Sequence, residues 1–228
     1  MASTLYICYF GVREPLVQTQ VIPYLREIGK GGTAVSLLTF EPEPLGRWEP
    51  GEHDRITRDL SDKGIAWHLL RYHKRPSVPA TAYDVIRGTV RVARLVRREK
   101  FDVLHGRVHL PTLMGALARK FSRHKPKLLF DIRGFFPEEY TDAGVWPEGG
   151  WLYRAAKRVE RWLMKESDGF VVLTENARDI LFPESRKTGI DKQGRPVEVI
   201  PCCVDLENRF SGDPSELRAQ FREQLGIS

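Results

Sequence analysis

Residues 130–140 read Phe-Asp-Ile-Arg-Gly-Phe-Phe-Pro-Glu-Glu-Tyr, directly after the short run Lys-Leu-Leu at 127–129. The apolar run is typical of a buried strand, and the glycine and proline that follow it indicate that regular structure ends there. Four charged residues crowd this strand end: Asp131, Arg133, Glu138 and Glu139. Ligands of open parallel α/β sheets bind beyond the carboxyl ends of the strands. We therefore interpret the Asp131–Glu139 loop as one wall of a binding site.

The rest of the chain alternates apolar runs with segments of helical spacing, which is typical of a parallel sheet with helices on both faces. The predicted strands are Leu5–Phe10, Thr33–Phe40, Ile65–Leu70, Phe101–His105, Lys127–Ile132, Gly169–Thr174 and Val197–Pro201. The predicted helices are Gln18–Ile28, Ala82–Glu99, Pro111–Phe121, Gly150–Glu166, Asn176–Phe182 and Ser215–Leu225. Residues 41–58 and 72–79 are predicted to be loops, with a helical turn at 59–63. The pattern predicts one doubly wound, mostly parallel α/β domain over 1–210, with 211–228 as a helical appendage.

Composition is that of an ordinary globular protein, since 41% of the 228 residues are hydrophobic and 29% are charged. No apolar run reaches the ~20 residues that a membrane helix needs. The N-terminus has no basic segment of a signal peptide and is interpreted as a first core strand. The cysteines, Cys8, Cys202 and Cys203, form no C-x-x-C pair and have no histidine cluster beside them. We therefore expect no metal site and a reducing, cytoplasmic compartment.

Two predicted helices carry basic stripes, and the chain has a formal net charge of +6. The basic residues are Arg87, Arg91, Arg94 and Arg98 on one helix and Arg154, Arg158, Arg161 and Lys165 on the other. The inward face of the first helix is predicted to carry Val85, Ile86, Val92, Ala93 and Val96. Such stripes are either solvated faces or contacts for an anionic membrane surface. A nucleic-acid partner is not expected, because no aromatic-rich basic groove or nucleic-acid motif accompanies them.

Other predicted strand ends also carry residues that could bind a ligand or take part in catalysis. The first strand ends at Gly11 without G-x-G-x-x-G or a P-loop, which disfavours Rossmann dehydrogenases and P-loop NTPases. Gly11 serves either a turn or the approach of a phosphate to the backbone. His105 and Arg107 end the fourth strand and suit a polar or anionic ligand. Asp131 and Arg133 either pair with each other or face a ligand. Glu138 and Glu139 are either a solvated charge pair or functional groups that bind sugar hydroxyls or act as a base.

An ordered set of motifs resembles a known family. The motifs are Asp102-Val-Leu-His105-Gly-Arg107, Phe130-Asp-Ile-Arg-Gly134 with Pro137-Glu-Glu139, Glu160, Ser167-Asp-Gly-Phe-Val-Val-Leu-Thr174 and Val199-Ile-Pro-Cys-Cys-Val-Asp205 with Phe210. Together they resemble the N-terminal half of a GT-B glycosyltransferase of the family 4 type. The resemblance implies a Rossmann-like acceptor domain facing a second, donor-binding domain across a cleft. It also implies retaining sugar transfer from a nucleotide-sugar, without a metal or other cofactor.

The resemblance assigns roles to several residues. Gly11 matches the glycine near the donor phosphate, and His105 matches the first histidine of a His-x-His pattern. Arg107 replaces the second histidine, which leaves His105 and Arg107 as the catalytic candidates. The acceptor side is expected to comprise Arg107, Asp131, Arg133, Glu138 and Glu139. Cys202 and Cys203 replace an Asn-Gly pair near the interdomain hinge.

The sequence therefore predicts the acceptor-binding half of a glycosyltransferase, inactive without a C-terminal domain that this chain lacks. Its partners would be a nucleotide-sugar and a glycan, lipid or small-molecule acceptor, at the cytoplasm or on the inner membrane face. Two alternatives remain open. One is a non-catalytic binding module or split-subunit partner, and the other is half of a GT-B-type sugar-nucleotide epimerase.

Overall fold

A parallel sheet forms the centre of the protein in the computed structural model, which describes residues 1–43, 45–202 and 214–226. Its strands are β1 (Ser3–Ile7), β2 (Ala34–Glu41), β3 (Ile65–Arg71), β4 (Val103–Arg107), β5 (Lys127–Ile132), β6 (Gly169–Val172) and β7 (Val197–Val199). They lie in the order β3-β2-β1-β4-β5-β6-β7, and every adjacent pair is parallel. The order reverses direction between β1 and β4, as in a doubly wound sheet. The predicted fold class is confirmed.

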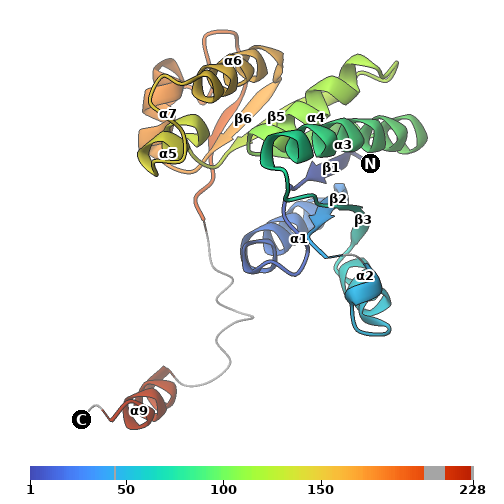
Figure 1. Cartoon of the computed structure of the whole chain (residues 1–228), viewed down its shortest axis with the longest axis vertical. Helices are drawn as coiled ribbons and strands as arrows, with labels where there is room; N and C mark the ends of the chain where they lie inside the picture. The colour runs from blue at the N-terminus through green and yellow to red at the C-terminus, as the bar shows by residue number, and fades with distance from the viewer. Residues whose placement is uncertain (44, 203–213, 227–228) are drawn as a thin grey trace.

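Helices cover both faces of this sheet (Figure 1). These helices are α1 (Ile22–Lys30), α2 (Glu52–Asp62), α3 (Ser77–Glu99), α4 (His109–Lys120), α5 (Phe136–Asp142), α6 (Trp151–Glu166) and α7 (Glu175–Leu181). The described residues also include helix α9 (Pro214–Gln224), which does not cover the sheet. Short helical turns are η1 (Val17–Val21), η2 (Leu45–Arg47) and η3 (Pro183–Arg186). Leu5 and Ile7 pack with α3, α4 and α6, whereas Tyr6 and Cys8 pack with η1, α1 and α2. Alternate residues of one strand therefore fill two separate cores.

Three of the predicted loops contain helix instead. Residues 41–58 include most of α2, in which Leu60 is buried against the sheet while the charged residues stay outside. Residues 72–79 include the start of α3, and the Asp131–Glu139 segment includes the first turns of α5. Proline and charged residues made these segments look like loops in the sequence. In α5, for example, Pro137 occupies the first turn, where a helix tolerates proline. The predicted C-terminal helix is confirmed as α9, whereas Cys203 and 204–213 lie outside the described residues.

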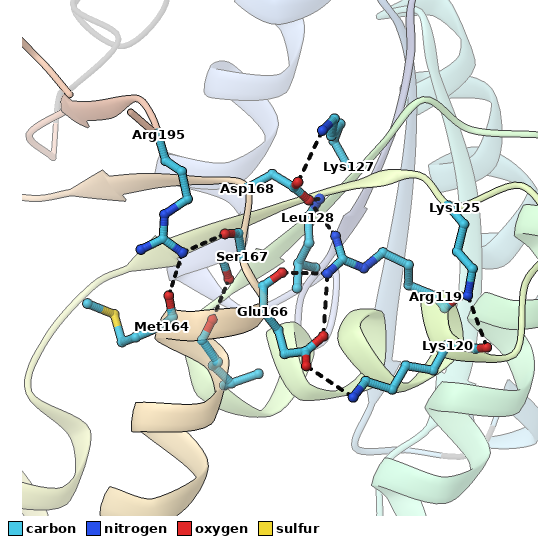
Figure 2. Close-up of polar contacts among 11 residues, drawn as sticks. Arg119, Lys120, Lys125, Lys127, Leu128, Met164, Glu166, Ser167, Asp168 and Arg195 are labelled. Atoms are coloured by element: carbon cyan, nitrogen blue, oxygen red, sulfur yellow. Dashed lines mark hydrogen bonds and ion pairs between the residues drawn. The ribbon is translucent and has the colours of Figure 1, made fainter. Parts of the chain in front are cut away.

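Ion pairs join α4, β5 and β6 at the amino edge of the sheet (Figure 2). Arg119 of α4 contacts the Asp168 carboxylate and donates to the Glu166 carbonyl. The Asp168 carboxylate also accepts the Leu128 backbone N–H at 2.9 Å. These bonds lie at the edge opposite the charged strand ends, so they stabilise the fold without forming part of the candidate site.

The Arg195 side chain binds backbone carbonyls at the C-terminal end of helix α6 (Figure 2). Its Nη1 donates to the carbonyls of Met164 at 2.7 Å and Ser167 at 2.9 Å, and its Nε donates to Asp191 at 2.8 Å. Because a lysine cannot supply these bonds together, we expect Arg195→Lys to lower the free energy of unfolding by about 2 kcal/mol. Urea denaturation followed by circular dichroism measures this. Arg186→Lys is the control, since Arg186 is 71% exposed and its loss should change stability by less than about 0.5 kcal/mol. Equal stability of the two variants would contradict the proposed role of Arg195.

Candidate functional site

Polar side chains from three adjacent strands line up at the carboxyl edge of the sheet. The strand register places Tyr6 beside His105, and Arg107 beside Asp131. Residues in register on neighbouring strands point to the same side of the sheet. For these four residues it is the face covered by η1 and α1, where Tyr6 is part of the core. The structure thus brings together His105, Arg107 and Asp131, which the sequence analysis took from two different strand ends.

Asp131 is the centre of this group and is fully buried. Its Oδ2 accepts the Tyr6 hydroxyl at 3.0 Å, and its Oδ1 lies 2.6 Å from Arg133 Nε. His105 Nε2 and Arg107 Nη1 lie 3.7 and 3.9 Å from Oδ2. Burial alone raises the pKa of Asp131, but His105 and Arg133 outweigh it and hold the pKa below its usual range. The carboxylate is therefore charged and serves as the common counter-ion of its neighbours; we call these five residues the Asp131 cluster.

Arg107 connects the Asp131 cluster to η1. Only 3% of Arg107 is exposed, and its Nη2 donates to Gln20 Oε1 at 2.9 Å. Its Nη1 lies 3.4 Å from the Tyr6 hydroxyl, to which it donates. The same Gln20 oxygen lies 3.5 Å from Cys202 Sγ, in the segment after β7. A buried guanidinium with both ends bonded is held in one orientation, so Arg107 supports the cluster from inside.

The turn from β4 to α4 fixes the backbone of these residues. Gly106 packs so closely on α4 that an added Cβ would lie 2.4 Å from the Thr112 Cα atom. Thr112 Oγ1 donates to the carbonyls of Gly106 at 2.9 Å and Val108 at 2.7 Å. Val108 adopts a φ of 59°, which a β-branched residue rarely accepts. Strained backbone of this kind is concentrated at functional sites in proteins, which agrees with the position of the cluster.

Gly11 lies in the loop after β1, in a pocket of about 310 Å³ lined by Gly11, Arg13, Glu14, Glu41, Pro42 and Glu43. A Cβ at Gly11 would lie 2.8 Å from Glu41 Oε2, and Glu41 accepts the Val12 backbone N–H at 2.9 Å. Burial raises the pKa of the Glu41 carboxyl, although Thr39 and Val12 donate to it. Glycine is thus needed here so that Glu41 can reach the backbone. The approach of Gly11 to a donor phosphate remains a prediction.

Glu138 and Glu139 do not act as a facing pair. Both lie in the first turn of α5, where consecutive residues point in different directions. Glu138 Oε1 lies 2.9 Å from Lys157 Nζ and accepts the Tyr153 hydroxyl at 3.3 Å, so it binds α6. The Glu139 carboxylate lies against Gly134, where an added Cβ would come within 2.0 Å of Oε1. Their contacts therefore separate the two carboxylates that sequence analysis grouped together.

A second polar link holds α4 to α6. His109 Nε2 lies 3.0 Å from Glu160 Oε2, and the His109 ring packs against Phe130 and Phe136 at centroid distances of 5.2 and 5.3 Å. Burial works to raise the pKa of Glu160, but His109 and Lys157 lower it below its usual range. This charged contact positions α6 behind the candidate site.

Comparison with known proteins identifies the family. The sequence matches the glycosyl transferase 4-like domain over residues 17–203. This chain belongs to the glycosyl transferase 4-like domain family. The resemblance stated from the motifs is thereby confirmed. No curated protein sequence matches the chain.

Solved structures of low sequence identity share the fold of this glycosyl transferase 4-like domain. Sucrose-phosphate synthase from Thermosynechococcus elongatus superposes with a TM-score of 0.63 at 14% identity, over 100% of this chain and 53% of that one. UGT2 of Phytolacca americana, in complex with UDP-2-fluoroglucose and pterostilbene, superposes with a TM-score of 0.56 at 12% identity. The match covers 97% of this chain and 57% of that one. A putative UDP-N-acetylglucosamine 2-epimerase from Listeria monocytogenes superposes with a TM-score of 0.52 at 13% identity, over 82% of this chain and 44% of that one. The chain thus spans about half the length of solved proteins that it resembles.

Some residues of this glycosyl transferase 4-like domain escaped the sequence analysis. Tyr6 and Gln20 complete the hydrogen bonds of the Asp131 cluster, and Glu41 supports the Gly11 loop. Asp84, fully buried on α3, accepts the Tyr9 hydroxyl at 2.9 Å and contacts His73 Nδ1 at 2.6 Å. The sequence signal that could have identified these residues was a polar residue within an otherwise apolar strand or helix face. Such residues need a buried partner, but sequence spacing does not identify that partner.

Proposed function

We propose that this glycosyl transferase 4-like domain is the acceptor-binding half of a retaining glycosyltransferase. It would transfer a sugar from a nucleotide-sugar to a glycan, lipid or small-molecule acceptor. The observation that supports this is the Asp131 cluster, which places two guanidinium groups around one buried carboxylate at the carboxyl edge of the sheet. That edge is where open α/β folds bind ligands. Arg107, Arg133 and Asp131 together carry one net positive charge, which suits a polar or anionic acceptor group.

Arg133 is the best candidate for direct contact with the acceptor. Its side chain is 10% exposed, whereas Asp131 is fully buried and Arg107 nearly so. Arg133 Nε lies 2.6 Å from the Asp131 carboxylate, so we assign the two Nη atoms as the donors for a ligand. His105 and Arg107 then orient this arrangement from behind, with Gly11 toward the donor phosphate. Glu138 and Glu139 would support the same wall through α5.

The test is sugar transfer by the protein expressed from its complete gene. Nucleotide release from UDP-glucose, UDP-N-acetylglucosamine and GDP-mannose is measured with and without acceptors. Arg133→Lys keeps the charge but removes the planar fork of donors, so we expect kcat/KM to fall about 10- to 100-fold. Arg55→Lys on the exposed side of α2 is the matched control and should retain wild-type kcat/KM. Wild-type kcat/KM in Arg133→Lys would exclude Arg133 from the site.

Several parts of the proposal rest on the family rather than on this site. We expect the 228-residue chain alone to show no transfer, because the donor-binding half would be supplied by a second domain. Transfer should also continue in the presence of EDTA, since no metal or other cofactor is expected. A reducing, cytoplasmic location accords with Cys8, whose thiol pKa burial raises to about 12 and thereby makes it unreactive.

The epimerase alternative is favoured by one observation, the similarity of this fold to the putative epimerase from Listeria monocytogenes. An epimerase would isomerise a nucleotide-sugar without any acceptor, which the same assay detects by the change in the sugar. A binding module or split-subunit partner would bind substrate without transfer or isomerisation. These outcomes separate the three classes.

A further inference from the structure

Helix α3 carries an apolar stripe on its outer surface. Tyr83, Ile86 and Val90 follow one another at helical spacing and are 50%, 64% and 42% exposed. The sequence analysis predicted Ile86 to face inward, which is wrong. The predicted inward positions of Val92 and Val96 are confirmed, and Leu95 faces the core with them. Three large apolar side chains therefore line the solvent side of a helix that already has a complete buried face.

Arginines surround this stripe. Arg94, Arg97 and Arg98 are exposed, and the Arg87 guanidinium lies over the Tyr83 ring at 5.6 Å. The acidic residues of α3 balance only part of this charge, because Asp84 is buried beneath the helix and Glu99 forms an ion pair with Arg98 at 2.6 Å. The outer surface of α3 thus combines exposed apolar side chains with a strongly positive border.

We propose that α3 binds the surface of an anionic phospholipid bilayer, with its axis parallel to the membrane plane. Apolar side chains flanked by arginine are the features of helices that lie in the bilayer interface. Within the described part of the chain no helix is long and apolar enough to cross a membrane. The apolar stripe would enter the boundary between headgroups and acyl chains, while the arginines bind lipid phosphates.

A second copy of the chain fits this surface less well than a bilayer. A symmetric contact between two α3 stripes would bring the arginines of both copies together, and like charges at an interface repel. A bilayer supplies negative charge along the whole length of the helix. The proposal is independent of the proposed function, because it depends on α3 and not on the Asp131 cluster.

Helix α6 provides an internal comparison. It exposes Arg154, Arg158, Arg161 and Lys165, but Leu163 is buried and Leu152, Ala156 and Val159 are half-buried. Trp151 in the first turn of α6 is 66% exposed, but beyond it the basic residues of α6 are not accompanied by an exposed apolar stripe like that of α3. If charge alone attracted the protein to lipid, both helices would matter equally.

The experiment is co-sedimentation of the full 228-residue chain with lipid vesicles. We expect binding to mixed phosphatidylcholine–phosphatidylglycerol vesicles that weakens as salt is raised, and much weaker binding to phosphatidylcholine alone. The double variant I86S/V90S removes apolar surface and keeps every charge. R94Q/R97Q does the reverse. Each should reduce the affinity for the mixed vesicles about tenfold or more, because both kinds of contact are needed.

The variant R158Q/R161Q on α6 is the matched control and should change the affinity by no more than about threefold. Circular dichroism verifies that each variant is folded, as expected for exposed positions. Vesicle binding that is absent, equal on neutral vesicles, or unchanged in both α3 variants would overturn the proposal. So would a dimer in light scattering that I86S/V90S dissociates without any effect on vesicle binding, because the stripe would then be a contact between copies.

Discussion

Asp131→Asn is expected to lower the free energy of unfolding by about 3–5 kcal/mol. Asp131 is fully buried and is the shared counter-ion of Arg107 and Arg133. Asparagine has almost the same shape, so the packing remains while the negative charge disappears. Two guanidinium groups are then left in a desolvated site without a counter-ion. Urea denaturation at neutral pH measures the loss, and Asp142→Asn on the exposed side of α5 is the matched control with no expected change.

The pH dependence of stability offers a second measurement on the same variant. The pKa of Asp131 in the folded protein lies below its usual value of 3.8. Its contribution is therefore complete above the pKa of the unfolded chain and is lost as the pH falls through the folded pKa. We expect the wild-type protein to lose stability in acid more steeply than Asp131→Asn, so that the two curves converge. Parallel curves would show that Asp131 does not titrate as the counter-ion of the cluster.

The fold was predictable because the strands that are buried in the structure are apolar runs in the sequence. Strands β2 and β5 are buried on both faces, so each is a nearly continuous apolar run in the sequence. Helix α2 was not predictable in the same way. It begins after Gly51 with Glu52 and Asp54, and Leu60 is its fully buried residue. A helix that covers only the edge of a sheet has a narrow apolar face, which charge and glycine conceal.

The candidate site was predictable in its strand ends but not in its bonds. His105 and Arg107 lie at the end of β4, Asp131 lies near the end of β5 and Arg133 follows β5. The two strands are neighbours in the sheet, so topology alone brings these residues together. The direction of each side chain depends on register, which the sequence does not state. Glu138 was grouped with these residues because of its charge, yet helix α5 turns it toward Lys157. A short helix after a strand thus changes which carboxylates converge.

Gly106→Ala is the second substitution for which we expect a large effect. The added Cβ would lie 2.4 Å from Thr112 Cα and 2.6 Å from Thr112 N, and these are backbone atoms that cannot rotate away. Helix α4 would have to move from β4, which disrupts a buried contact between Met114 and the core. We expect a loss of about 3 kcal/mol or more in the free energy of unfolding, at the upper end for overpacked cores. Thermal and urea denaturation measure this loss.

Gly29→Ala is the matched control, because its added Cβ would meet only Val35 Cγ2 at 3.9 Å, an ordinary contact. Gly29 lies inside α1, where alanine should stabilise the protein by up to about 1 kcal/mol. A double variant with Thr112→Ala separates the possible causes. Removing Oγ1 leaves the contacts to Thr112 Cα and N, so stability should not recover. Recovery in the double variant would mean that α4 can shift to accept a larger residue, and that the β4–α4 turn does not hold Arg107 as rigidly as its hydrogen bonds indicate.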